Sequence, residues 1–232
     1  MNNLTVVKKE EEKQNSPNHT IIFYVGSDAE EFLVHKEFVF RHSPVLRAAL
    51  TSTAKLQVYH LPSTTVAAFR LLSSFFYTGK LDLVLHSTTK KIDETDPKQT
   101  LSGKEHGPAC AAQDLDLINL YILAGELKIP AVQTLVTMNM HRISMCCGPM
   151  STSVLPLIWE KTPVGSPLRH LAVDQYCWQA PIQALLAAPH NFPKEMLISI
   201  ACFLWNEVSE DTLMRRRDEC KVEDYLVEDD GN

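Results

Sequence analysis

Residues 20–50, whose sequence is TIIFYVGSDAEEFLVHKEFVFRHSPVLRAAL, decide the order of elements in the N-terminal half of the chain. Two runs of β-branched and aromatic residues, 21–25 and 32–34, flank a short polar turn, which is typical of a β-hairpin. A short helix is expected over 36–41, and Ser43-Pro44 starts another, with serine as the N-cap and proline at the first helical position. Because two strands are not stable alone, helices must cover one face of this hairpin.

The alternation of strand and helix continues beyond this stretch. Residues 57–61 are predicted to form a third strand. A largely buried helix follows, with Ser63 or Thr64 as its cap and Gly79 as its left-handed stop. Residues 81–85 are a weaker strand candidate. The fold class is therefore α+β, with a small three-stranded sheet flanked by helices.

The second half of the chain is predicted to be helical. Residues 87–114 are poor in large apolar side chains and are interpreted as a solvated insertion. Helical spacing then resumes at Leu117, and Pro130 opens a second helix, so a helical hairpin is expected there. Three further helical stretches form a C-terminal extension. They are expected at 155–160, from Ser166-Pro167 to Tyr176, and at 194–208.

Composition and charge narrow the class of function. The 232-residue chain has a net charge of −6, and the segment from Glu207 to Asn232, with ten acidic and four basic side chains, carries all of it. A neutral body with an acidic tail does not suit nucleic acid, whose phosphates require a concentrated basic face. No secretory signal is recognised near the N-terminus, and the longest apolar run, 196–205, is shorter than a membrane span. We therefore expect no membrane partner and a cytoplasmic or nuclear location.

Motifs for cofactor and metal chemistry are not found in the sequence. Neither glycine-rich phosphate-binding motif is present, and no cofactor is expected. The six cysteines are expected to stay reduced. Cys146 and Cys147 are adjacent, and the histidine closest to them in sequence is His141, so they are interpreted as small core residues and no metal site is predicted.

A catalytic trio is the one enzymatic alternative. Cys177, His170 and Asp174 combine a nucleophile, a base and an acid at spacings that could share a helix face. No glycine-rich elbow or oxyanion loop accompanies them. A cysteine hydrolase is therefore kept as a remote alternative, and no catalytic residue is assigned.

Four phrases in register resemble a BTB/POZ domain. They are Tyr24-Val25-Gly26 with FLVHK (32–36), RHSPVLRAAL (41–50), FFYTGKL (75–81) and LYILAGELKIP (120–130). Farther on, WEKTPVGSPLR (159–169) and VDQYCW (173–178) resemble the C-terminal segment of filamentous-fungal BTB proteins. The resemblance implies a BTB/POZ domain at 20–142 and a helical C-terminal extension at 143–208. Charge-dense composition predicts a disordered tail at 1–19 and an acidic tail at 209–232.

This resemblance also implies a function. Members of the family are non-enzymatic interaction modules that pair with themselves or with another BTB protein, and some are substrate adaptors that bind the cullin scaffold of a ubiquitin ligase. Three departures bear on these roles. Thr20 and Leu33 occupy positions where charged residues are frequent, 51–57 lacks the acidic residue of cullin-binding relatives, and 1–19 lacks the amphipathic helix that many dimers exchange. His35 is expected to form a hydrogen-bonded corner, and Tyr77 is expected to anchor the core.

Overall fold

The computed structural model describes residues 19–50, 57–83, 85–87, 98–100 and 103–207. Its main sheet has the order β2-β1-β3, with β1 (Thr20–Val25) in the centre. Strand β2 (Glu30–His35) pairs antiparallel with β1, and β3 (Gln57–Leu61) pairs parallel with it. The three strands lie where the sequence predicts them.

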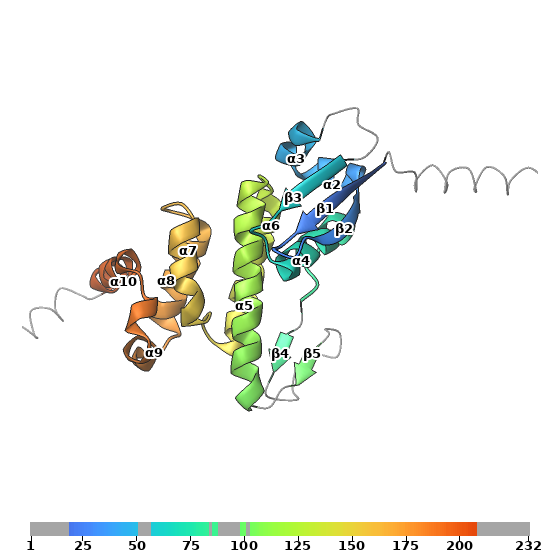
Figure 1. Cartoon of the computed structure of the whole chain (residues 1–232). Coiled ribbons are helices and arrows are strands. Elements are labelled where there is room, and N and C mark those ends of the chain that lie inside the picture. The colour runs from blue at the N-terminus through green and yellow to red at the C-terminus, as the bar shows by residue number, and fades with distance from the viewer. Residues whose placement is uncertain (1–18, 51–56, 84, 88–97, 101–102, 208–232) are drawn as a thin grey trace, which may run out of the picture.

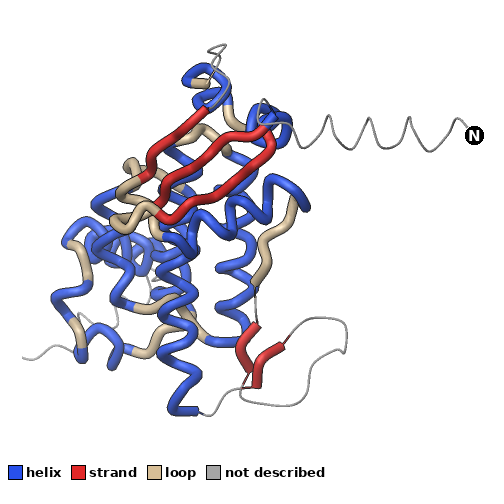
Figure 2. The backbone as a smooth tube through the Cα atoms, turned by 45° about the vertical axis from the view of Figure 1, so that its right-hand side comes forward, coloured by secondary structure: helices blue, strands red, loops and turns tan. Residues whose placement is uncertain are grey.

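Alternation along β1 gives the sheet a buried and an outer face. Ile21, Phe23 and Val25 are fully buried. The Phe23 ring packs 4.9 Å from that of Phe69 on α4 (Val66–Thr78), between ring centroids. In Figure 2 the helices lie behind the sheet and leave its other face uncovered. The covered face of the sheet forms one side of the hydrophobic core of the N-terminal half.

The helices beside the sheet begin and end as their capping residues dictate. Ser43 accepts a hydrogen bond from the Leu46 amide and starts α3 (Pro44–Ala49), as predicted. Helix α4 differs slightly from the prediction, because its cap is Thr65. It ends at Gly79, whose φ of 69° lies in the left-handed region that glycine adopts without strain. Helix α2 spans Lys36–His42.

The predicted insertion at 87–114 is partly wrong. Helix α5 begins at Gly103 and runs to Glu126, so 103–114 is helical. The expected strand at 81–85 is also displaced, because β4 spans Leu85–Ser87 and pairs parallel with β5 (Lys98–Thr100) near the N-terminal end of α5 (Figure 1). Gly103, Gly107 and Pro108 are weak helix formers and concealed these turns, whereas the alanines that follow favour them.

Helix α5 is the central element of the molecule. It packs along α6 (Pro130–Cys147) in the expected helical hairpin, with the sheet on one side and the C-terminal helices on the other (Figure 1). Helix α6 runs across the boundary predicted at 142/143. The C-terminal elements are η2 (Thr152–Val154), α7 (Leu155–Lys161), α8 (Pro167–Trp178), α9 (Ile182–Ala187), η3 (Pro189–Asn191) and α10 (Lys194–Glu207).

One hydrophobic core joins these parts. Fully buried residues of the C-terminal helices, including Leu155, Ile158 and Leu168, belong to the same cluster as Ile118 and Leu120 of α5. The predicted tails, apart from residue 19, and the predicted end of the last helix lie outside the described residues. Within the described ranges, no helix combines the length and apolar character that a membrane span requires.

Candidate functional site

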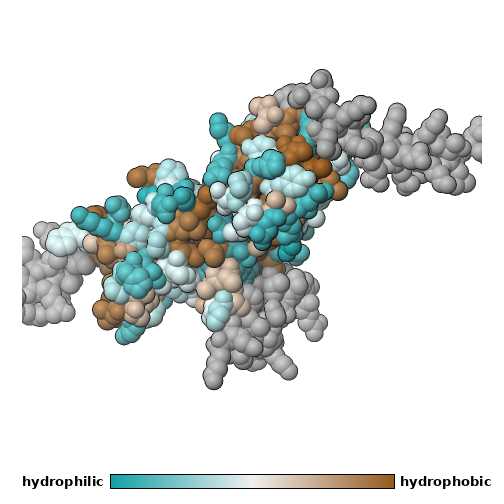
Figure 3. All heavy atoms as spheres, in the orientation of Figure 1, coloured by the Kyte–Doolittle hydropathy of each residue, from teal (hydrophilic) through white to brown (hydrophobic). Residues whose placement is uncertain are grey.

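The outer face of the sheet is an exposed apolar surface. Ile22 on β1 lies between Leu33 and Val58 of the neighbouring strands, and Leu33 is 62% exposed. Beside them the rings of Tyr24 and His60 stack with their centroids 5.2 Å apart. In Figure 3 hydrophobic residues are visible over this part of the molecule and again among the C-terminal helices.

Helix α10 is apolar on both sides. Its inner stripe consists of Met196, which is fully buried, and Ile200, which packs against the core one turn later. On the same side, the Phe203 ring packs edge-on against the Trp178 ring of α8. Its outer stripe consists of exposed apolar side chains on the opposite face of the helix. These are Leu197, Ile198, Ala201, Leu204 and Trp205. Exposed apolar side chains gathered on one face of a helix mark a surface that a partner can cover.

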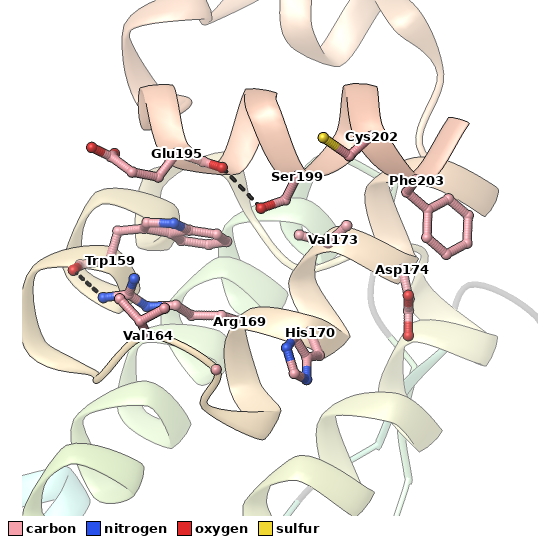
Figure 4. A pocket seen from close by; sticks show the side chains of 11 residues that line it. Trp159, Val164, Arg169, His170, Val173, Asp174, Glu195, Ser199, Cys202 and Phe203 are labelled. Carbon is pink, nitrogen blue, oxygen red and sulfur yellow. Dashed lines mark hydrogen bonds between the residues drawn. The ribbon is translucent and has the colours of Figure 1, made fainter. Parts of the chain in front are cut away.

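A groove of about 550 Å³ separates α8 from α10 (Figure 4). His170 and Asp174 line it from α8, and Ser199 lines it from α10. The Ser199 hydroxyl donates 2.9 Å to the Glu195 carbonyl of its own helix, so it is not directed at a base. At the end of the groove the Arg169 guanidinium lies 5.4 Å from the centroid of the Trp159 ring and donates to the Trp159 carbonyl.

The trio of the remote hydrolase alternative is not assembled. His170 and Asp174 line the groove, whereas Cys177 packs against the core. In the described part of the chain, no hydrogen bond joins Cys177 to either of them. Burial raises the pKa of Cys177, and the Asp174 carboxylate raises it further. A nucleophilic cysteine needs the opposite shift, so this geometry does not favour a hydrolase.

The corner at the end of β2 forms as expected. The His35 amide donates to the Tyr77 hydroxyl over 3.1 Å, and His35 Nδ1 lies 2.9 Å from the same oxygen. The Tyr77 ring packs against Phe38 with 4.8 Å between centroids. Tyr77 is 43% exposed, however, so it joins the corner to the surface and is not the core anchor that was predicted.

A cluster of soft ligand atoms lies where α5 and α6 meet. His106 and Cys110 occupy adjacent turns of α5, and Cys147 is the last residue of α6. One ligand atom from each residue lies within 4.8 Å of the other two, and His106 Nε2 is 3.7 Å from Cys110 Sγ. All three residues are half-buried. We call this group the α5–α6 cluster.

Burial and neighbouring acidic groups raise the pKa values of the cysteines in the α5–α6 cluster. Burial raises the pKa of Cys110 to about 12, and the hydrogen bond with Cys147 and the charges of Cys147 and Asp114 contribute. Burial also raises the pKa of Cys147. Asp114, one turn beyond Cys110, is itself buried, and its pKa rises to about 6 although the Ser151 amide donates to it. The site therefore disfavours anions in the absence of a cation.

The chain that follows the α5–α6 cluster is tied back to the helical hairpin. The Ser151 amide donates 2.8 Å to Asp114 Oδ2. The Met150 amide donates 2.9 Å to Gln175 Oε1, and the Tyr176 hydroxyl donates 2.8 Å to the Met150 carbonyl. These bonds position α8 against the hairpin.

Sequence reasoning did not find the α5–α6 cluster. It tested Cys147 against His141, the histidine closest in sequence, whereas the histidine that reaches Cys147 is His106. The signal was the spacing of His106, Cys110 and Asp114, one helical turn apart. Such spacing has meaning only on a helix, and this segment was interpreted as an insertion.

A family model matches the N-terminal part of the chain. Residues 10–96 match the family model of the BTB/POZ domain. This segment is a BTB/POZ domain. The chain is also similar to the solved BTB domain of human gigaxonin, with 14% identity, a TM-score of 0.34, and coverage of 58% of this chain and 87% of that one. No curated protein matches the chain.

The BTB/POZ match confirms the predicted fold and gives the general class of function, a protein–protein interaction module. It begins ten residues before the predicted domain start and ends within the predicted insertion. The resemblance of the C-terminal segment to filamentous-fungal members stays a prediction. The expected absence of enzyme activity, cofactors and metals also stays a prediction.

Proposed function

We propose that this chain is a self-association module that pairs with a second copy through the outer stripe of α10. The observation that carries the proposal is that stripe, in which Trp205 is 68% exposed and Ile198 is 52% exposed. Burying such side chains against a partner is favourable by about 25 cal/mol for each Å² of apolar surface. Aromatic and aliphatic anchors of this kind are typical of the centre of an interface.

The arrangement of apolar side chains along α10 favours a second copy as the partner. In an antiparallel pair of α10 helices, Leu197 of one copy lies near Leu204 of the other, and the small side chain of Ala201 lies near the twofold axis. These three side chains belong to the exposed outer stripe. A twofold interface must be self-complementary, and large side chains that meet on either side of a small central one satisfy this requirement in shape.

Light scattering on the full chain tests this proposal. We expect the mass of a dimer, and we expect Ile198→Asp to give the mass of a monomer with an unchanged circular-dichroism spectrum, because residue 198 is exposed. Leu33→Asp, on the outer face of the sheet, is the matched control and should stay dimeric. A monomeric wild-type chain, or a dimer that only Leu33→Asp breaks, would contradict the α10 interface.

A parallel experiment tests the two other predicted partners, a cullin and a different BTB protein. Affinity purification that recovers a cullin in stoichiometric amount, and independently of Ile198, would support the substrate-adaptor function instead. Recovery of a different BTB protein in place of a second copy would support hetero-association. The region of the expected cullin contact, 51–57, lies outside the described residues except for Gln57.

A further inference from the structure

The α5–α6 cluster has the composition of a metal site. A cysteine thiolate and a histidine nitrogen are the ligands that Zn²⁺ prefers, and sites with two cysteines and one histidine leave a fourth position for water or another ligand. The cluster consists of these three side chains, His106, Cys110 and Cys147. They come from two helices that are separated in sequence and held together by the core.

Its dimensions agree with tetrahedral coordination. With Zn–S distances of about 2.3 Å and Zn–N distances of about 2.0–2.1 Å, the ligand atoms of a tetrahedron lie roughly 3.6–3.8 Å apart. His106 Nε2 lies 3.7 Å from Cys110 Sγ, and each of the three ligand atoms lies within 4.8 Å of the others. The three ligand atoms therefore lie close to the spacing that one shared ion requires, and their partial exposure leaves a route of entry.

We propose that His106, Cys110 and Cys147 form a binding site for a thiophilic divalent cation of the Zn²⁺ class. Binding converts both thiols to thiolates and releases two protons to solvent, while the neutral imidazole donates its lone pair. The charge of the three-ligand site with the ion is then zero. The adjacent Asp114 carboxylate, which disfavours thiolates in the metal-free site, stabilises a cation there.

The position of the site indicates what the metal does. Met150 and Ser151 follow Cys147 closely in the chain. The Met150 amide donates to Gln175 on α8, and the Ser151 amide donates to Asp114 on α5. A metal bridge between α5 and α6 fixes the point where the C-terminal helices leave the hairpin. We infer that metal binding stabilises the attachment of the C-terminal helices to the BTB/POZ part, as expected for any ligand that binds only the folded state.

Titration of the full chain with Co²⁺ tests the site. The chain is purified with a non-chelating phosphine reductant, stripped with EDTA and exchanged into metal-free buffer. We expect one Co²⁺ per chain, with visible bands of a four-coordinate ion and near-ultraviolet bands of thiolate ligation, and both should disappear when Zn²⁺ is added. Metal-dependent release of protons should accompany binding.

Single substitutions separate ligands from bystanders. Cys110→Ser, Cys147→Ser and His106→Asn should each weaken Co²⁺ binding by at least about 10–100-fold, the loss seen when even an outer partner of a metal ligand is removed. Cys146→Ser is the matched control, because Cys146 is exposed and points away from its neighbour on the helix; it should bind as the wild type does.

Circular dichroism of each metal-free variant shows whether it folds. If a serine variant does not fold, His106→Asn still tests the site, because it keeps both thiols. Three results would overturn the proposal. They are absence of stoichiometric Co²⁺ binding by the reduced chain, binding that the ligand substitutions leave unchanged, and a Cys110–Cys147 disulfide in place of metal binding.

Discussion

At the scale of single residues, Ser43 shows how a short motif fixes tertiary structure. Its side-chain oxygen accepts from the Leu46 amide and starts α3, and its hydroxyl donates 2.8 Å to the Leu127 carbonyl at the end of α5. Ser43 is fully buried. One oxygen therefore caps a helix and joins two motifs that lie 84 residues apart in sequence.

We expect Ser43→Ala to lower the free energy of unfolding by about 1–3 kcal/mol. The change removes an N-cap and leaves the Leu127 carbonyl without this donor in a buried position. Urea denaturation measures the loss. Ser73→Ala, on α4, is the control and should change stability by less than about 0.5 kcal/mol. Equal effects of the two substitutions would show that the buried hydroxyl is unimportant.

His42 predicts a pH dependence of stability. Burial lowers its pKa, and the charge of Arg41 lowers it further; from α4 it faces the uncharged rings of Phe75 and Phe76. The unfolded state therefore binds a proton more readily than the folded state does between the lowered pKa and about pH 6.5. The contribution of His42 is complete above that window and is lost as the pH falls through it.

His42→Gln should therefore lose less stability than the wild type when the pH is lowered from about 7.5 to about 5.5, a range that spans the ordinary histidine pKa. Urea denaturation at both pH values measures the two losses. All other side chains are common to both proteins, so their contributions cancel in the comparison. A loss as large in His42→Gln as in the wild type would contradict the assigned role.

At the scale of elements, periodicity and capping residues were sufficient to predict a helix or strand wherever it buries a single face. The three strands, α2, α3 and the caps at Ser43 and Gly79 follow directly from residue pattern. The N-terminal half of α5 does not, because Gly103, Gly107 and Pro108 interrupt its helical pattern and one of its stabilising bonds is tertiary. Asp114 is an example: it is a polar residue in sequence, but it is buried and accepts from Ser151, 37 residues later. Local propensity does not contain such a bond.

Helix α4 provides a test of the predicted core. Leu72 is fully buried on its inner face. Leu72→Asp places an unpaired charge there, and we expect a loss of about 3–5 kcal/mol or complete unfolding. Arg70→Ala, on the same helix, removes only an exposed ion pair with Glu30 and should cost less than about 1 kcal/mol. Thermal unfolding followed by circular dichroism distinguishes them; an unchanged midpoint for Leu72→Asp would contradict the core assignment.

At the scale of the whole molecule, the class of function was predictable and the candidate sites were not. Helical spacing places residues on a face of one helix, but it does not say which faces remain uncovered after folding. The outer stripe of α10 is recognised only once Met196 is seen to face the core. The α5–α6 cluster requires the antiparallel packing that brings residue 147 next to residues 106 and 110.

The shared core predicts that the chain unfolds as one unit. All three tryptophans, Trp159, Trp178 and Trp205, lie in the C-terminal helices, so their fluorescence reports that region alone, whereas far-ultraviolet circular dichroism reports every helix. Because Leu155 and Ile118 belong to one buried cluster, we expect the two signals to have coincident midpoints in urea.

Ser43→Ala, which acts near the sheet, should shift both midpoints equally, since its effect passes through the shared core to the tryptophans. Tyr176→Phe is the reciprocal variant. It removes the hydroxyl that donates to the Met150 carbonyl but keeps the ring against Phe192, and it should lower both midpoints by the equivalent of about 1 kcal/mol. A tryptophan transition that precedes the circular-dichroism transition, or that Ser43→Ala leaves in place, would show that the C-terminal helices unfold separately from the BTB/POZ domain.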